Sequence, residues 1–299
     1  MLTYQMNIRE QALQDFAKRR SRLFASLETP SDGAGATRHQ AARQCFPAVR
    51  TPSLYSNGMR GKLHCFKAGG LIEHESALER DFYRLMEWDY GVDTFVAQPF
   101  KVPYKLKSGR NSHYTPDCFV ISSDDVRGES GFYAPTAYEI KERSELDEKW
   151  PEIKHKLKAA RSFLSESGFR FRLLTEDRIH PVFLKNIEFL LEFRGPRFLF
   201  RSLLTNEIVE RLFTVAESAK GDFTPRYLLE RTSDLAAQEE IIPWLWNLYT
   251  DYVFQCDLLV PLSLDTVSWL CGHAGRGMTN VGFPSKRPDW RHPDNDWRR

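Results

Sequence analysis

Two short segments decide the fold of this chain: YTPDCFVI at residues 114–121 and YEIKE at residues 138–142. Both are rich in β-branched and aromatic residues, which is typical of strands in a buried sheet. Side chains two residues apart on a strand share a face, so Glu139 and Lys141 point to the same side of the sheet. Asp117 opens the other strand. If the two strands are neighbours, Asp117 and Glu139 converge on one cation with Lys141 beside it.

The surrounding segments predict an α/β fold. Apolar residues recur at helical spacing in two stretches, and several strand-like runs lie between and after them. The expected order is helix, four strands, helix, strand and helix, at residues 75–88, 94–97, 100–106, 114–121, 133–141, 151–166, 169–175 and 182–193. This order outlines a mixed central sheet flanked by helices. We expect Pro151 in the first turn of its helix, where a missing N–H is tolerated.

The residue types at this site suit phosphodiester hydrolysis. That reaction uses a hard divalent cation that prefers carboxylate oxygens, and Glu79 in the first helix can complete the set begun by Asp117 and Glu139. Lys141 adds a compact positive charge that can orient the attacking water or offset charge on the phosphate. Glu75, one turn before Glu79, is the alternative metal-site acid. An ordinary edge strand with solvated charges would show the same YEIKE pattern.

Other polar residues near the site admit two interpretations each. His74 and His113 could act as a catalytic base, or they could be ordinary hydrogen-bonded or surface histidines. Lys154, Lys158 and Arg161 form one stripe on the helix that follows the site. Such a stripe suits either a solvated face or a contact with DNA phosphates.

Composition narrows the class of protein. The chain has 299 residues, a formal net charge of +2 and 41% hydrophobic residues, which is enough apolar material for a packed core. No apolar run reaches the roughly 20 residues that a membrane span needs, and the N-terminus lacks the order of a secretory signal. The five cysteines form no CxxC pair and no zinc-site spacing. We therefore expect a soluble, cytosolic protein with reduced thiols and no membrane partner.

Six motifs follow one another in residues 72–194: ESALERDF, QP, YTPD, YEIK, LTE and NI, at residues 75–82, 98–99, 114–117, 138–141, 174–176 and 186–187. Together they resemble the N-terminal catalytic domain of the TnsA-type transposon endonucleases, within the PD-(D/E)XK restriction-like nuclease superfamily. The resemblance implies a restriction-endonuclease-like core. It also implies a Mg²⁺-dependent endodeoxyribonuclease in which Mn²⁺ can substitute.

The resemblance implies a role for each site residue. Glu79 corresponds to the helical acid of the family, Asp117 to its first metal carboxylate and Lys141 to its lysine. Glu139 occupies a position that is acidic in some members and glutamine in others. Glu79, Asp117 and Glu139 are thus the implied metal ligands, and all four residues are implied to be catalytic. Gln98 corresponds to the QP strand, where it either contacts DNA or only shapes the strand.

The resemblance also implies partners. In the family this subunit cuts the 5′ strands at the transposon ends, while a DDE-type (TnsB-like) transposase cuts and joins the 3′ ends. The C-terminal region is expected to contact an AAA+ (TnsC-like) ATPase regulator. Such a protein is bacterial and cytoplasmic, and it associates with the nucleoid when it is on DNA. The alternatives are a free-standing restriction-like or repair endonuclease, and a non-catalytic DNA-binding or scaffold subunit.

We expect four segments along the chain. Residues 1–46 form a basic N-terminal arm and linker, and residues 47–197 form the restriction-endonuclease-like catalytic domain. Residues 198–272 form a smaller, mostly helical partner-binding domain, which the resemblance implies is winged-helix-like. Residues 273–299 form a flexible basic tail, in which Trp290 and Trp297 either anchor in a partner or have no role.

Overall fold

The computed structural model describes residues 14–15, 18–19, 21–22, 44–46, 59–122, 135–195, 198 and 201–271. The chain divides into two compact units, and the boundary between them lies between Asp177 and Arg178. Most of the N-terminal arm and the whole of the tail at 273–299, with Trp290 and Trp297, lie outside the described residues.

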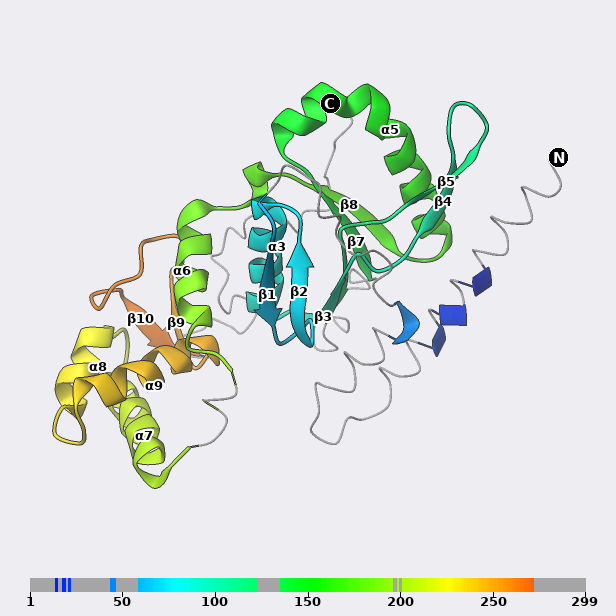
Figure 1. Cartoon of the computed structure of the whole chain (residues 1–299). Coiled ribbons are helices and arrows are strands. Elements are labelled where there is room, and N and C mark those ends of the chain that lie inside the picture. The colour runs from blue at the N-terminus through cyan, green and yellow to red at the C-terminus, as the bar shows by residue number, and fades with distance from the viewer. Residues whose placement is uncertain are drawn as a thin grey trace. The chain divides into compact units, whose positions relative to one another are not determined.

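A four-stranded mixed sheet forms the centre of the first unit (Figure 1). Its strands are β3 (Val92–Ala97), β6 (Cys118–Ser122), β7 (Thr136–Ile140) and β8 (Arg170–Leu174), in that spatial order. The β3–β6 and β6–β7 pairs are antiparallel, whereas β7 and β8 are parallel. The segments YTPDCFVI and YEIKE therefore do supply neighbouring strands, as the sequence predicts.

Two helices cover the two faces of this sheet. Phe82 of α3 (Ala77–Trp88) packs on Tyr138, with ring centroids 4.9 Å apart. Ala137 precedes Tyr138 on β7 and therefore faces the opposite side of the sheet. There it packs in one cluster with Leu157 of α5 (Arg143–Glu166). Burial on both faces explains why the strands are almost continuously apolar. Along the chain, α3 is followed by β3, β6 and β7 of the sheet, then by α5 and β8. This order confirms the expected α/β, restriction-endonuclease-like core.

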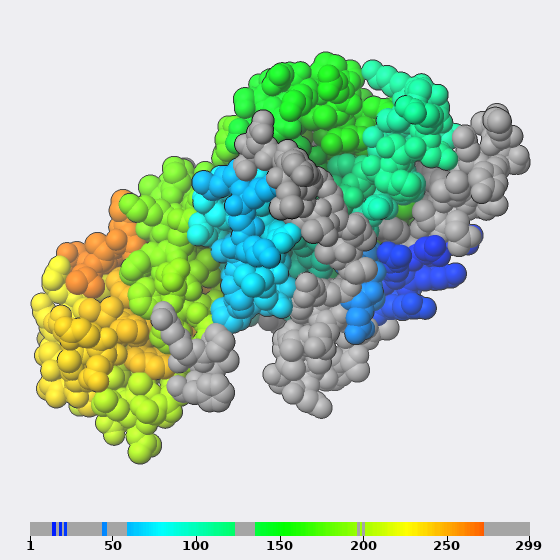
Figure 2. Space-filling model, viewed as in Figure 1, coloured from blue at the N-terminus to red at the C-terminus, as the bar shows by residue number. Residues whose placement is uncertain are grey.

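Two small hairpins accompany the sheet. One pairs β1 (Gly61–Cys65) with β2 (Gly70–His74), and the other pairs β4 (Val102–Lys105) with β5 (Asn111–Tyr114). The second hairpin lies at the surface beside α5 (Figure 2). The sequence predicted one strand over 114–121, but β5 ends at Tyr114 and β6 begins at Cys118. Pro116 lies in the break because proline has no N–H to donate to a sheet ladder.

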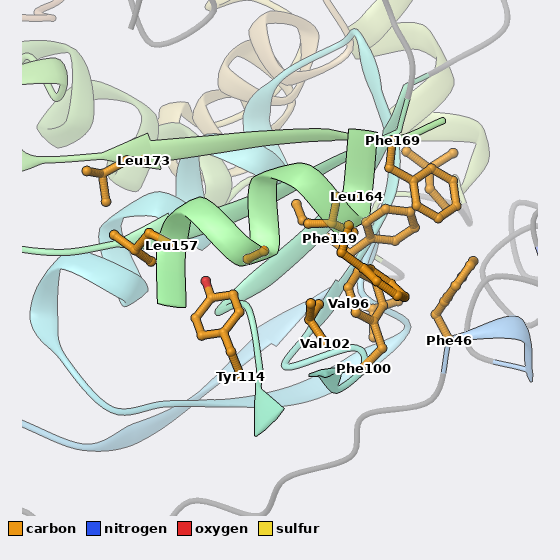
Figure 3. Packing of buried hydrophobic residues seen from close by; sticks show 14 of the residues in the cluster. Phe46, Val96, Phe100, Val102, Tyr114, Phe119, Leu157, Leu164, Phe169 and Leu173 are labelled. Carbon is orange, nitrogen blue, oxygen red and sulfur yellow. The ribbon is translucent and has the colours of Figure 1, made fainter. Parts of the chain in front are cut away.

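The core of the first unit lies between the sheet and α5 (Figure 3). Phe46 is completely buried there, and its ring lies 5.5 Å from Phe100, 5.0 Å from Phe119 and 5.7 Å from Phe169. The sequence had placed Phe46 at the end of the N-terminal arm. Its burial shows that the end of this segment is part of the first unit.

Helix α5 is longer than expected, because it begins at Arg143 and places Pro151 in its interior. An interior proline costs about 3 kcal/mol through its missing hydrogen bond and its steric clash. The turns before it are retained because Leu146 is buried in the core and Trp150 packs against the same cluster. The prediction that Pro151 lies in the first turn was therefore wrong.

The second unit is mostly helical. It contains α6 (Pro181–Leu191), α7 (Leu203–Ser218), α8 (Pro225–Thr232), α9 (Gln238–Thr250), β9 (Phe254–Cys256) and β10 (Ser268–Leu270). Strands β9 and β10 are antiparallel, and Phe223, between α7 and α8, forms a bridge with Ser268. The last three helices, α7, α8 and α9, precede this small antiparallel sheet, which is compatible with the winged-helix-like domain that the resemblance implies.

The boundary between the units lies earlier than residue 197 because α6 belongs with the second unit. The Asn186 amide nitrogen donates to the carbonyls of Leu258 at 2.9 Å and Val260 at 2.7 Å, and its oxygen accepts from the Leu262 N–H at 3.0 Å. Asn186 is buried, so these bonds satisfy the side chain and fix α6 against the loop after β9.

Two features of the described residues bear on the class of protein. None of their helices is both long enough and apolar enough to cross a membrane. All five cysteines are free thiols.

Candidate active site

Asp117 is fixed at the start of β6 through its backbone and its side chain. Its N–H donates to the Tyr138 carbonyl at 2.9 Å, and its carbonyl accepts from the Gln98 N–H at 2.9 Å and the Tyr83 hydroxyl at 3.2 Å. Its Oδ2 accepts from the Ile140 N–H at 2.7 Å. The side chain is thereby held against the end of β7, where Glu139 and Lys141 lie.

Glu139 is buried near the end of β7 and contacts three side chains. Its Oε2 accepts from the Tyr114 hydroxyl at 2.5 Å. Its Oε1 lies 4.0 Å from Nζ of Lys141 and 3.7 Å from Nζ of Lys156. The expected pairing of Glu139 with Lys141 on one face of the strand is present, and a second lysine from α5 joins it.

Glu79 lies in the first turn of α3 and is also buried. The Ser76 hydroxyl caps the helix by accepting from the Glu79 N–H at 3.1 Å, and Glu79 Oε2 accepts from the Glu75 N–H at 2.8 Å. These bonds use the Ser-x-x-Glu pattern that typically begins a helix. Glu79 thus has a structural role as well as its place near the other carboxylates.

Crowding and burial raise the pKa values of two of these acids. Burial raises the pKa of Asp117 well above its usual range, and the Glu139 carboxylate raises it further, while Lys141 and the Ile140 N–H oppose the change. Burial likewise raises the pKa of Glu79, whereas the hydrogen bond from the Glu75 N–H and the charge of Lys141 act to lower it. Carboxyl groups with raised pKa values in one cluster are typical of functional sites.

Lys141 remains a cation in this setting. Burial lowers its pKa, but the surrounding carboxylates, led by Asp117 and Glu139, outweigh that effect and raise the pKa above its ordinary value. An ammonium group with a raised pKa does not release its proton near neutral pH. Lys141 therefore offers positive charge and hydrogen-bond donors beside the carboxylates.

The three carboxylates fit a divalent cation by their chemistry. They are hard oxygen donors, and within the described residues Oδ1 of Asp117 and Oε1 of Glu79 form no hydrogen bond. As they stand, however, no three Asp, Glu, His or Cys side chains of that part of the chain are gathered closely enough to hold a metal ion. A cation bound here would have to draw the carboxylates together and relieve their mutual repulsion.

The alternative site residues take structural positions. Glu75 contributes its N–H to Glu79, as described above. His74 is buried, its Nδ1 lies 3.0 Å from the Ser76 carbonyl oxygen, and burial lowers its pKa. A Cβ on Gly61 would come within 2.7 Å of His74 Nε2, so the ring is also enclosed by the β1 backbone. His113 is exposed on β5.

The candidate DNA contacts differ in their exposure. Lys154, Lys158 and Arg161 are exposed on α5, as a phosphate-binding stripe requires. Gln98 is buried, with a φ of 46°, and its amide oxygen has no hydrogen-bond partner within the described residues. Its visible role is to anchor the Asp117 backbone. DNA contact by these four residues stays a prediction.

Sequence reasoning missed Lys156 as a site residue. Lys156 lies on the same helical face as Ile153, Leu157 and Ala160, which pack in the core. A lysine on an apolar stripe is uncommon unless its charge is paired, and this was the available signal. Its Nζ also lies 5.3 Å from the centre of the Tyr114 ring, so Lys156 contacts both Glu139 and the tyrosine that donates to it.

Asp117→Asn is expected to stabilise the metal-free chain, increasingly so as pH rises. The folded-state pKa of Asp117 is raised above the unfolded value of about 4, so between these values the folded chain holds a proton that the unfolded chain has released. Wild-type stability therefore falls as pH rises through this window, and asparagine removes that loss. We expect a gain on the order of 1 kcal/mol at about pH 8 relative to about pH 4.

Urea unfolding in EDTA at the two pH values measures this difference. Asp147→Asn is the matched control, because Asp147 is exposed on α5. A stability difference between Asp117→Asn and wild type that does not change with pH would contradict the expectation.

Comparison with known proteins supports the interpretation of this geometry. Residues 89–176 match the TnsA-like endonuclease N-terminal family. The match includes Asp117, Glu139 and Lys141 and ends where the first unit ends, whereas Glu79 lies before it. No curated protein matches the chain. Residues 89–176 of the first unit are thus similar to the N-terminal domain of the TnsA-like endonucleases.

Proposed function

We propose that this protein is a Mg²⁺-dependent endodeoxyribonuclease that cuts the 5′ strands at transposon ends, as a subunit of a heteromeric cut-and-paste transposase. One observation carries the proposal. Asp117, Glu139 and Lys141 lie at the same end of β6 and β7, inside the region that matches the TnsA-like endonuclease family.

Glu79, Asp117 and Glu139 would hold the metal, because carboxylates are the ligands that Mg²⁺ prefers in proteins. When bound, the cation supplies Lewis-acid polarisation of the phosphodiester and a lowered pKa for a coordinated water. The chain's own residues position these ligands. The Ile140 N–H holds Asp117, the Tyr114 hydroxyl holds Glu139, and the first turn of α3 holds Glu79.

Lys141 would act on the phosphate. Its ammonium group is charged and only partly exposed, so it meets less screening than a surface lysine. Placed beside the metal-site acids, it can donate to the non-bridging phosphate oxygens or orient the attacking water. Its pairing with Glu139 keeps it directed into the site before DNA arrives.

The proposed partners are transposon-end DNA, a DDE-type (TnsB-like) transposase and an AAA+ (TnsC-like) ATPase regulator. The family match supports an association with transposition. The second unit supports a separate binding function, because it is a compact helical domain with its own core. We assign the ATPase contact to this unit.

Lys156→Ala is expected to lower the cleavage rate about tenfold, which corresponds to about 1.4 kcal/mol. The reason is that Lys156 is the closer of the two cations on Glu139 Oε1, so its loss leaves the buried carboxylate less well held. Single-turnover cleavage of a labelled transposon end measures the effect. Because Lys156 acts through Glu139, adding Lys156→Ala to Glu139→Gln should have little further effect. Additive losses in the double variant would contradict this positioning role.

Strand-specific cleavage tests the proposed function. Transposon-end DNA, labelled on each strand separately, is incubated with the chain in Mg²⁺ or in EDTA, with and without the co-encoded transposase and ATPase. Cleavage of the 5′ strands only in Mg²⁺ and only with the partners supports the proposal. Efficient cutting by the chain alone would favour a free-standing restriction-like or repair nuclease. DNA binding without cutting in any mixture would favour a scaffold subunit.

A further inference from the structure

The hairpin formed by β4 and β5, residues 101–114, is strongly and uniformly basic. It carries Lys101, Lys105, Lys107 and Arg110, all exposed, and the sequence has no acidic residue between Asp93 and Asp117. Within the part of the chain that the structure describes, none of these four cations forms an ion pair. Four exposed positive charges without acidic neighbours favour a polyanionic partner.

The hairpin has a defined shape before any partner binds. Its strands pair from Val102–Tyr114 to Lys105–Asn111, and the Leu106 N–H donates to the Arg110 carbonyl at 2.9 Å. Gly109, with a φ of 83°, closes the turn in a conformation that favours glycine. A preformed arm loses little conformational entropy when it binds.

Helix α5 holds the hairpin in place. The His155 Nε2–H donates to the Lys105 carbonyl at 2.6 Å, and the rings of His155 and Tyr104 lie 6.2 Å apart at an angle of 65°. The exposed Lys154 and Lys158 flank His155 on the same helix. The cations of the hairpin and of α5 thus belong to neighbouring elements of one unit (Figure 2).

The base of the hairpin is part of the candidate active site. Strand β5 ends in Tyr114, whose hydroxyl donates to Glu139, and Asp117 follows three residues later. Arg110 lies four positions before Tyr114, a distance of about 13 Å at roughly 3.3 Å per residue. Successive phosphates of one DNA strand advance by about 3.4 Å along the helix axis. A hairpin that runs along the duplex axis would therefore place its tip at the backbone about four nucleotides from the phosphate at the site.

We infer that the basic hairpin is a DNA-binding arm that contacts the phosphates of the duplex next to the cleavage point. The inference rests on the proposed nuclease function and extends it to a surface outside the catalytic residues. Lys107 and Arg110 at the tip contact the backbone, and these contacts carry no sequence information. Through Tyr114, the arm connects DNA binding to the position of Glu139.

Removing the two charges at the tip tests the inference. K107Q/R110Q is compared with wild type in binding a duplex transposon end in EDTA, over a series of salt concentrations. Each lost phosphate contact lowers the slope of log affinity against log salt by about 0.9, so we expect a decrease of about 1.8. Affinity should fall about ten- to a hundredfold at about 0.1 M salt. Hydroxyl-radical footprinting should lose protection about four nucleotides from the cut.

The matched control is K62Q/K149Q, which removes two exposed lysines that pair with Glu73 and Glu145 in the same unit. It should keep the wild-type slope and affinity. K107Q/R110Q could also keep the wild-type slope and affinity while wild type binds and cuts DNA. That result would overturn the DNA-binding role of the hairpin and leave the nuclease function intact. In that case the basic hairpin would be the binding site of an acidic protein surface and not of DNA. If wild type does not bind duplex DNA at all, the DNA-binding arm is overturned, and strand-specific cleavage with the transposase and ATPase decides the nuclease function separately.

Discussion

Asp117→Asn is expected to abolish 5′-strand cleavage while the fold and the assembly with the transposase remain. Asparagine keeps an oxygen that can accept from the Ile140 N–H, but it removes the negative charge that a divalent cation requires. Loss of the metal site removes both the polarisation of the phosphate and the activated water, so we expect the rate to fall by at least about a thousandfold. Single-turnover cleavage of 5′-strand-labelled DNA measures the loss.

The same variant should change the product of the complete reaction. With the 3′ cuts intact and the 5′ cuts absent, simple insertions should give way to a joined, replicative intermediate. Asp147→Asn, which changes an exposed aspartate on α5, should give wild-type products. Double-strand excision by Asp117→Asn would show that the site is assigned to the wrong residues.

Lys141→Ala is expected to lower the cleavage rate about a hundred- to a thousandfold, with little change in DNA affinity. Removing one donor that stabilises developing negative charge typically has an effect of this size. Lys141 is partly buried beside Glu139 and stays charged, so the loss acts on the chemical step rather than on surface attraction. Single-turnover rates at saturating protein measure the effect on the chemical step. A separate binding measurement gives the effect on DNA affinity.

Two further variants sharpen the Lys141 result. Lys149→Ala removes an exposed lysine that pairs with Glu145 on α5, and it should leave the rate unchanged. Lys141→Arg keeps the charge but replaces a compact ammonium with a planar group, so it should recover only part of the rate. A Lys141→Ala enzyme that cuts at the wild-type rate would exclude Lys141 from the reaction.

The sequence was sufficient for the central sheet because its signals there are local. Successive side chains of a strand point to opposite faces, and this alternation placed Glu139 and Lys141 on one face. The buried strands β6 and β7 were also apolar enough to be recognised from the sequence. The structure confirms that β6 and β7 are neighbours and that Asp117 lies against the end of β7. The residue types needed for metal-dependent hydrolysis were therefore visible before the fold was known.

The remaining features depend on tertiary contacts that no local pattern encodes. Phe46 enters the core from a segment whose own composition indicates a linker, and three distant aromatic rings surround it. Pro151 is tolerated inside α5 because residues before it are buried. Lys156 becomes a site residue only because α5 crosses the sheet at Glu139, many residues away in the sequence.

The most direct test of the central claim is a single-turnover reaction on transposon-end DNA whose 3′ strand is already cut, with the transposase and ATPase present. We expect one new cut, in the 5′ strand, that appears in Mg²⁺ and disappears both in EDTA and with Asp117→Asn. A 5′-strand cut that persists with Asp117→Asn or in EDTA would contradict the assignment of this carboxylate cluster as the metal-dependent nuclease site.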